Sequence, residues 1–210
     1  MVYRTTPKME ERKAARRRKF LDVATRLFGE FGYHKTTVPM VVAESDSSTG
    51  SFYFYFDNKE DIFAEVLKTI GERMSAELNE AIAQEAERIE QMRAAIERLF
   101  VFLAENPAEA KILVIESPGL GGPLAALQRG ILASHARSVE RAIAGLSERP
   151  PPGDPAVLAH CWVGAVYEAV RYWLELPAAE RRPADEVAAE VAKFNLRGIG
   201  SGDAHGTGLS

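Results

Sequence analysis

The stretch from residue 36 to residue 56, TTVPMVVAESDSSTGSFYFYF, constrains the fold of this chain more than any other. Thr37 can cap a helix with its side-chain oxygen, and Pro39 falls in the first turn of that helix, where its missing N–H is harmless. Residues 44–47 then interrupt the helical pattern, and either Ser47 or Ser48 can cap a second helix. The stretch therefore predicts two short helices joined by a tight turn.

Two helices joined in this way form a helix-turn-helix, whose second helix enters the major groove of DNA. The predicted second helix opens on Thr49, Gly50 and Ser51, which are small enough to let its end approach base edges closely. Free N–H groups at that end also favour phosphate. The pattern favours a DNA-binding role for the N-terminal part of the chain.

Positive charge is concentrated beside this stretch. The whole chain has a net charge of −4, but residues 1–19 hold eight Lys or Arg against two Asp or Glu. An apolar stripe at three- and four-residue spacing predicts a helix from about Glu10 to Phe31, with Gly32 as its C-cap. Arg16 and Arg17 precede this stripe and can lie along a phosphate backbone. The alternative is a solvated arm that binds no partner.

Several segments, in order and at matching spacing, resemble the DNA-binding domain of the TetR family of bacterial one-component regulators. They cover roughly residues 12 to 68 and are residues 20–24 (FLDVA), 27–28 (LF), 31–33 (FGY), 36–38 (TTV), 48–56 (STGSFYFYF) and 58–60 (NKE). The chain departs from the family at the turn, where residues 45–47 replace an Ala-Gly-Val-like sequence. It also departs at Thr49, where a basic residue is common, and at Phe54, where a His is common. These departures indicate another turn geometry, fewer phosphate contacts and an altered operator preference.

The motif and the resemblance together imply a set of DNA contacts. Tyr53 is the implied phosphate contact, whereas Phe52 and Phe56 are the implied core residues. Phe54 could touch a thymine methyl group or shield the backbone, and Lys59 could reach a phosphate or remain solvated. The full predicted set is Arg16, Arg17, Thr36, Thr37, Ser47, Ser48, Thr49, Gly50, Ser51, Tyr53, Phe54 and Lys59.

The rest of the chain predicts helices only. Asn58 can cap a long helix whose apolar stripe continues to Ile82, which suggests a rod that links two parts of the molecule. Neither strand alternation nor a repeat of fixed period appears. We predict an all-α fold of about nine helices, with an N-terminal arm and three-helix helix-turn-helix domain at residues 1–56. A larger effector-binding and dimerisation domain would follow at residues 57–197. Residues 148–154 would form a loop, and the Gly/Ser-rich residues 198–210 a disordered tail.

The segment from Ala156 to Leu174 is apolar on nearly every side, which predicts a helix that is covered all round. Part of that cover would be a second subunit, since this helix and the final one resemble the dimerisation bundle of the family. The predicted interface residues are Val163, Tyr167, Trp173, Val187, Val191 and Phe194. The alternative is a helix at the centre of a monomer.

His135 lies on an apolar helix face, where it is either a hydrogen-bonded core residue or a polar group in an effector pocket. The predicted pocket would hold a small, largely apolar effector. Its predicted walls are Phe100, Leu103, Ile112, Ile115, Leu127, Ile131, His135, Trp162, Val166 and Val170.

Other classes of protein find less support. His160 and Cys161 are adjacent, so on a helix they point about 100° apart and cannot act as a base and nucleophile pair. The four histidines show no metal-ligand spacing, and we predict neither a metal, a cofactor nor an enzyme activity. One cysteine, no signal peptide and charged residues in the most apolar segment favour a cytoplasmic protein that does not enter a membrane. We therefore predict a ligand-responsive homodimer that binds a double-stranded palindromic operator, most simply as a repressor. A helical interaction module or a small enzyme without DNA binding remains the alternative.

Overall fold

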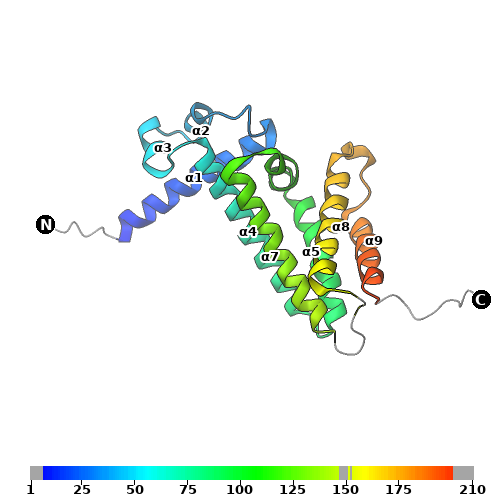
Figure 1. Cartoon of the computed structure of the whole chain (residues 1–210). Helices are drawn as coiled ribbons and strands as arrows, with labels where there is room; N and C mark the ends of the chain where they lie inside the picture. Colours follow the sequence, from blue (N-terminus) through cyan, green and yellow to red (C-terminus); the bar gives the residue numbers. More distant parts are fainter. Residues whose placement is uncertain (1–6, 147–150, 152, 201–210) are drawn as a thin grey trace, which may run out of the picture.

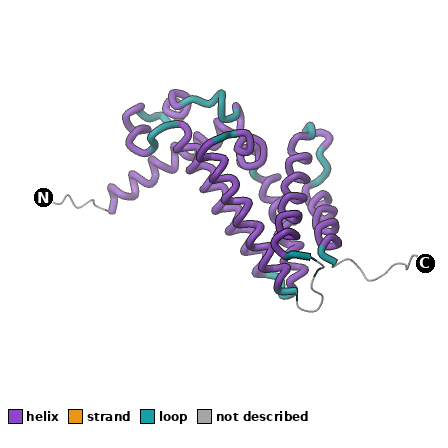
Figure 2. The backbone as a smooth tube through the Cα atoms, in the orientation of Figure 1, coloured by secondary structure: helices purple, strands orange, loops and turns teal. Residues whose placement is uncertain are grey.

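The computed structural model describes residues 7–146, 151 and 153–200, and all regular structure in that part is helical (Figures 1 and 2). Nine α-helices occur within these ranges, which confirms the predicted all-α class. They are α1 (Pro7–Phe31), α2 (Val38–Glu44), α3 (Thr49–Tyr55), α4 (Lys59–Ala83), α5 (Arg88–Glu105), α6 (Pro107–Lys111), α7 (Gly122–Ala144), α8 (Pro155–Glu175) and α9 (Ala184–Gly198).

Several boundaries differ from those predicted. Helix α1 begins at Pro7, about a turn before the predicted start. The structure also shows that α6 ends at Lys111 and continues as a π-helical turn, Ile112–Glu116, followed by a 3₁₀ turn, Ser117–Gly119. Helix α9 includes Gly198, and Ile199 is buried, so the ordered chain extends past the predicted start of the tail. Most of the predicted 148–154 loop and residues 201–210 lie outside the described residues.

The three N-terminal helices and the start of α4 enclose a small aromatic core at one end of the molecule (Figure 1). The ring of Phe52 meets that of Phe20 edge-on at a centroid distance of 5.7 Å and lies 5.6 Å from that of Phe56. Helices α2, α3 and α4 each begin at a predicted cap: the side chains of Thr37, Ser48 and Asn58 accept the N–H group of the residue three positions along. Phe52 and Phe56 are both buried in this core, which confirms their implied positions.

Helix α4 runs from this end into the larger helical part, where it packs along α5 and contacts α7 (Figure 1). Its predicted stripe is buried from Phe63 to Met74. Helix α5 also packs on α9, and α7 packs on α8. None of the described helices combines the length and the apolarity that a membrane crossing requires.

The end of α1 is joined to the segment that contains α6 and the π-turn. Gly29 touches Ala108 so closely that a Cβ on Gly29 would lie 2.5 Å from the Cβ of Ala108. Gly32 ends α1 at a φ of +81°, as its predicted C-cap role requires, and the backbone N–H of Tyr33 then donates to Oε2 of Glu116 at 3.0 Å. We call these contacts the α1–α6 joint.

Candidate nucleic-acid interface and effector pocket

Helix α3 has a buried face and an exposed face, and the exposed face carries the predicted base-contacting residues. Phe52 is fully buried, whereas Tyr53 is 54% exposed and Phe54 is 66% exposed. Thr49 and Gly50 are exposed at the start of the helix, and nothing lies within 4 Å of the position that a Cβ on Gly50 would take. The helix therefore offers a short, uncrowded end and one aromatic side to a partner.

The turn between α2 and α3 is held by its own hydroxyl groups. Asp46 adopts a left-handed conformation with a φ of +49°, which an Asp tolerates better than most residues. The hydroxyl of Ser45 is buried and donates to the carbonyl of Val42 at 3.1 Å, and that of Ser47 donates to the carbonyl of Ser45 at 3.1 Å. These bonds hold the backbone of the turn where α2 ends.

The cations of α1 divide into those that face outward and one that faces inward. Arg16 is exposed, and its Nη1 lies 3.4 Å from Oγ of Ser47 in the turn. Arg17 instead pairs with Glu65 of α4 at 2.8 Å, and its guanidinium lies 5.5 Å from the ring centroid of Phe56. Arg17 thus ties α1 to α4, and its contact with DNA stays a prediction.

Thr36 requires a correction. Its side chain is fully buried, and its hydroxyl lies within hydrogen-bonding distance of the carbonyls of Leu27, at 3.1 Å, and Gly32, at 2.9 Å. It closes the end of α1 and has no surface to offer DNA. Lys59 is half-buried, and its Nζ donates to the carbonyl of Tyr33 at 3.0 Å while lying 4.3 Å from the Tyr33 ring. Its contact with phosphate stays a prediction.

The predicted pocket walls separate into core residues and residues that line hollows. Five of them are buried in the hydrophobic core, and their role as pocket walls stays a prediction: Phe100, Leu103, Ile112, Val166 and Val170. The other five line hollows, but three different ones: Ile115 lines the first, Leu127 and Ile131 the second, and Trp162 the third, while His135 is shared by the second and third. The difference arises because the apolar pattern identifies a buried face but not which part of that face remains unfilled.

A pocket of about 390 Å³ lies between α4, α5 and α7, with Trp162 of α8 at one side. It adjoins a wider hollow of about 670 Å³ between α4 and α7, and the two share Ser75, Asn79, Ser134 and His135. The smaller pocket is lined by both polar and apolar side chains. Its polar lining is Ser75, Asn79, Arg88, Gln91, Ser134, His135, Ser138 and Arg141, and its apolar lining includes Leu78, Ile82, Met92, Val139 and Trp162. We call the smaller pocket, of about 390 Å³, the α4–α7 pocket. The spacing of Ser75 and Asn79, one turn apart beside the α4 stripe, was the available signal for its polar residues.

Burial lowers the pKa of the His135 imidazolium below its ordinary value of 6.5, because the pocket removes water from the charged form. The unfolded chain then binds a proton at this residue at a higher pH than the folded chain does. The free energy of unfolding should therefore be unaffected above about pH 7 and should fall as the pH drops through 6.5 towards the lowered pKa.

Urea unfolding of wild type and His135→Gln between pH 7.5 and pH 5 measures this effect. The acid-side loss of stability should be smaller in His135→Gln than in wild type, whereas His160→Gln, a change at an exposed position, should retain it. Identical pH profiles for wild type and His135→Gln would contradict the assignment.

The predicted dimer-interface residues also divide. Trp173 is buried within the chain, where its ring lies 6.0 Å from that of Phe100 and its Nε1 donates to the carbonyl of Arg182 at 2.9 Å. Its predicted place on a dimer face is therefore corrected. Val163, Tyr167, Val187 and Val191 are half-buried against the core, and Phe194 is 69% exposed. Val157 and Tyr172 of α8, which were not predicted, are 58% and 64% exposed.

Sequence comparison with known proteins matches only the N-terminal part of the chain, whereas structural comparison matches most of it. Residues 20–66 match the family model described as bacterial regulatory proteins, tetR family. Among curated proteins, the HTH-type transcriptional regulator HbdR of Aromatoleum sp. (strain CIB) is 41% identical over 66 residues, which is 31% of this chain and 28% of HbdR. The chain spans only 28 to 36% of the length of HbdR and two further curated regulators of this type.

Solved structures match over nearly the whole chain. The fatty acid degradation regulator FadR of Bacillus halodurans is 18% identical with a TM-score of 0.74, and the match covers 92% of this chain and 96% of that one. FadR of Bacillus subtilis in complex with stearoyl-CoA is 21% identical with a TM-score of 0.76, covering 86% and 98%. At these identities the likeness extends to the fold alone. Residues 20–66 thus belong to the tetR family of bacterial regulatory proteins, and the chain as a whole shares its fold with solved regulators such as FadR.

Proposed function

We propose that this protein is a ligand-responsive transcriptional regulator that binds a palindromic operator as a homodimer and acts as a repressor. One observation carries the proposal: α3 buries Phe52 and turns Thr49, Gly50, Tyr53 and Phe54 to the outside. A core contact would bury these residues, whereas a helix that reads a groove must expose them.

The residues of this surface take different roles in the proposal. Thr49 and Ser51 face the base edges, because they stand at the N-terminal end of the recognition helix. Tyr53 and Arg16 contact phosphates. Lys13 lies with its Nζ 5.5 Å from the centroid of the Phe54 ring, so the two side chains would approach the DNA together.

Exposed apolar side chains on α8 and α9 support a homodimer. Val157 and Tyr172 on α8 and Phe194 on α9 are large, apolar and more than half exposed. Packing these helices against their copies in a second subunit would cover them. A two-fold axis would then place the two recognition helices about 34–36 Å apart, on successive major grooves.

The α4–α7 pocket is the proposed effector site. Its volume lies within the range of small-molecule sites, about 300–1,000 Å³. The FadR structure from Bacillus subtilis, which has the same fold, contains stearoyl-CoA, and this supports a small-molecule effector here. An effector that binds the DNA-incompetent arrangement more tightly would shift α4. The distance between the two recognition helices would then no longer match the spacing of successive major grooves. By linkage, operator DNA should weaken effector binding by the same factor.

Selection of bound duplexes from a random pool tests the function. We expect a palindromic sequence with half-sites about one helical turn apart. Selection with Thr49→Ala should recover a changed half-site, whereas Tyr53→Phe should recover the same half-site with weaker binding throughout. Recovery of no common sequence from the wild-type protein would rule out the proposed function.

The two neighbouring arginines of α1 give a matched prediction about phosphate contacts. Arg16→Gln should lower operator affinity and reduce the slope of log K against log salt by about 1, because one phosphate contact is lost. Arg17→Gln should leave this slope unchanged, since Arg17 is already paired with Glu65. Fluorescence anisotropy titrations at four salt concentrations measure both slopes. Equal changes in the two variants would show that the assignment of outward and inward cations is wrong.

A further inference from the structure

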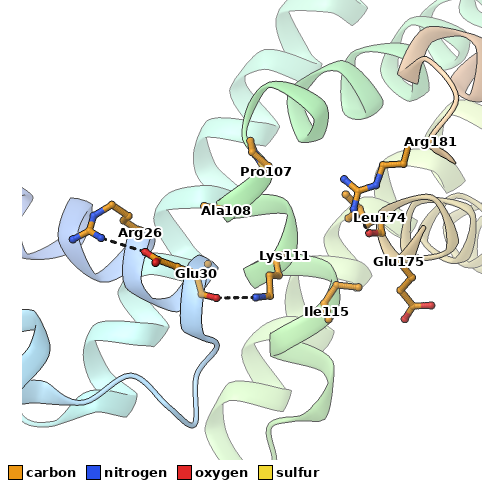
Figure 3. Close-up of a pocket in the computed structure, with 10 residues that line it drawn as sticks. Arg26, Glu30, Pro107, Ala108, Lys111, Ile115, Leu174, Glu175 and Arg181 are labelled. Atoms are coloured by element: carbon orange, nitrogen blue, oxygen red, sulfur yellow. Dashed lines mark hydrogen bonds and ion pairs between the residues drawn. The ribbon is translucent and has the colours of Figure 1, made fainter. Parts of the chain in front are cut away.

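We propose that a second binding site, separate from the α4–α7 pocket, lies at the α1–α6 joint and takes a small amphipathic anion, an acidic group on a short apolar body. The site is a cleft of about 570 Å³ bounded by the end of α1, by α6 with the π-turn, and by the end of α8 with the segment that follows it. Figure 3 shows these three walls and the side chains that they contribute.

Half of the residues that line the cleft are small or apolar. Gly29 and Ala108, which touch each other, line it together with Pro107, Ile115 and Leu174. An inorganic anion alone would leave these groups without contacts. An apolar body of several carbon atoms would bury them, at about 25 cal/mol for each Å² removed from water.

The rim of the cleft carries two cations that lack a carboxylate partner within the described part of the chain. Lys111 donates from Nζ to the carbonyl oxygen of Glu30 at 3.3 Å. Arg181 donates from Nε to the carbonyl oxygen of Leu176 at 2.9 Å and from Nη2 to that of Leu174. Main-chain carbonyls orient these groups without neutralising their charge.

The remaining charges at the rim are already compensated. Arg26 pairs with Glu30 at 3.4 Å and with Glu44, and Glu175 pairs with Arg171 at 2.7 Å. The uncompensated charge of the cleft is therefore positive and belongs to Lys111 and Arg181. A carboxylate or phosphate group on the ligand would form a charge-assisted hydrogen bond with either cation, and such a bond is stronger than one between neutral groups.

A ligand in this cleft would contact both sides of the α1–α6 joint. Arg26, Gly29 and Glu30 belong to α1, whereas Ala108, Lys111 and Ile115 belong to α6 and the π-turn. An occupant would touch the helix that enters the aromatic core and the segment that holds it in place. It should stabilise the joint by mass action, whether or not the protein regulates transcription.

Isothermal titration of the full-length chain with octanoate, in the absence of DNA, tests the proposal. Octan-1-ol lacks the charge and inorganic phosphate lacks the apolar body, so each should bind at least about tenfold more weakly than octanoate. Lys111→Met should weaken octanoate binding about tenfold, which corresponds to the loss of one charge-assisted contact of about 1.4 kcal/mol. Lys111→Arg should retain most of the binding.

Two controls locate the binding. Lys193→Met removes a cation from an exposed position on α9 and should leave octanoate affinity unchanged. Arg141→Met removes a cation from the α4–α7 pocket and should also leave it unchanged. Thermal unfolding of each unliganded variant shows whether it folds. The proposal fails if octan-1-ol binds as tightly as octanoate, if folded Lys111→Met binds like wild type, or if Arg141→Met abolishes binding. A failure here would leave the operator selection unaffected, so the two proposals are tested separately.

Discussion

Replacing Phe52 with alanine should destabilise the N-terminal helical unit by about 3–5 kcal/mol, the usual cost of truncating a buried aromatic side chain. Phe52 is fully buried and joins the rings of Phe20 and Phe56 across the small core. A unit of this size has few other large side chains to compensate, so the cavity should not collapse at low cost. Urea unfolding followed by circular dichroism measures the loss.

Phe54→Ala is the matched control, because it removes the same ring two residues away from an exposed position. Its effect on the free energy of unfolding should stay within about 0.5 kcal/mol, while operator affinity falls. The two variants therefore separate folding from recognition on one helix of seven residues. If both variants lost stability equally, the exposed position of Phe54 would be wrong.

Glu116→Ala should both lower stability and loosen the α1–α6 joint. The Glu116 carboxylate accepts the backbone N–H of Tyr33 at 3.0 Å, and its oxygens lie about 3 Å from the position that a Cβ on Gly32 would take. Without it, a partly buried N–H loses its acceptor, which costs about 1–3 kcal/mol. The effect of an effector on operator affinity should also shrink, because the larger helical part would hold α1 less firmly.

Glu116→Gln tests whether the lost hydrogen bond causes these effects, since its amide oxygen can still accept the Tyr33 N–H. It should recover most of the stability that Glu116→Ala loses. Glu80→Ala, at an exposed position on α4, should change neither stability nor coupling. Urea unfolding gives the first quantity, and operator titrations with and without effector give the second. Equal losses in Glu116→Ala and Glu80→Ala would contradict the role of this bond.

Local features of the N-terminal part were predictable from the sequence, and non-local ones were not. The caps at Thr37, Ser48 and Asn58 depend on three-residue spacing, which the sequence shows directly. The pairing of Arg17 with Glu65 joins residues 48 positions apart, and no pattern along α1 distinguishes Arg17 from Arg16. The buried hydroxyl of Thr36 was missed for the same reason, because its partners are set by how α1 ends.

The pocket was less predictable than the helices. Apolar periodicity correctly marked Phe100 and Val170 as inward-facing, but inward-facing residues fill a core unless neighbouring helices leave a gap. The gap lies where Ser75 and Asn79 of α4 face Ser134 and His135 of α7. The cleft at the α1–α6 joint was not predicted at all, since its walls come from three regions distant in sequence.

The π-turn at Ile112–Glu116 determines which way the Glu116 carboxylate points. Its wide turn is closed by the N–H of Ser117, which donates to the carbonyl of Ile112 five residues earlier. This accommodates one residue more than an α-helical turn would. Tightening the segment by that one residue would rotate everything after it by about 100°. The Glu116 carboxylate would then face away from Tyr33, so the extra residue of this turn is what brings the carboxylate to the end of α1.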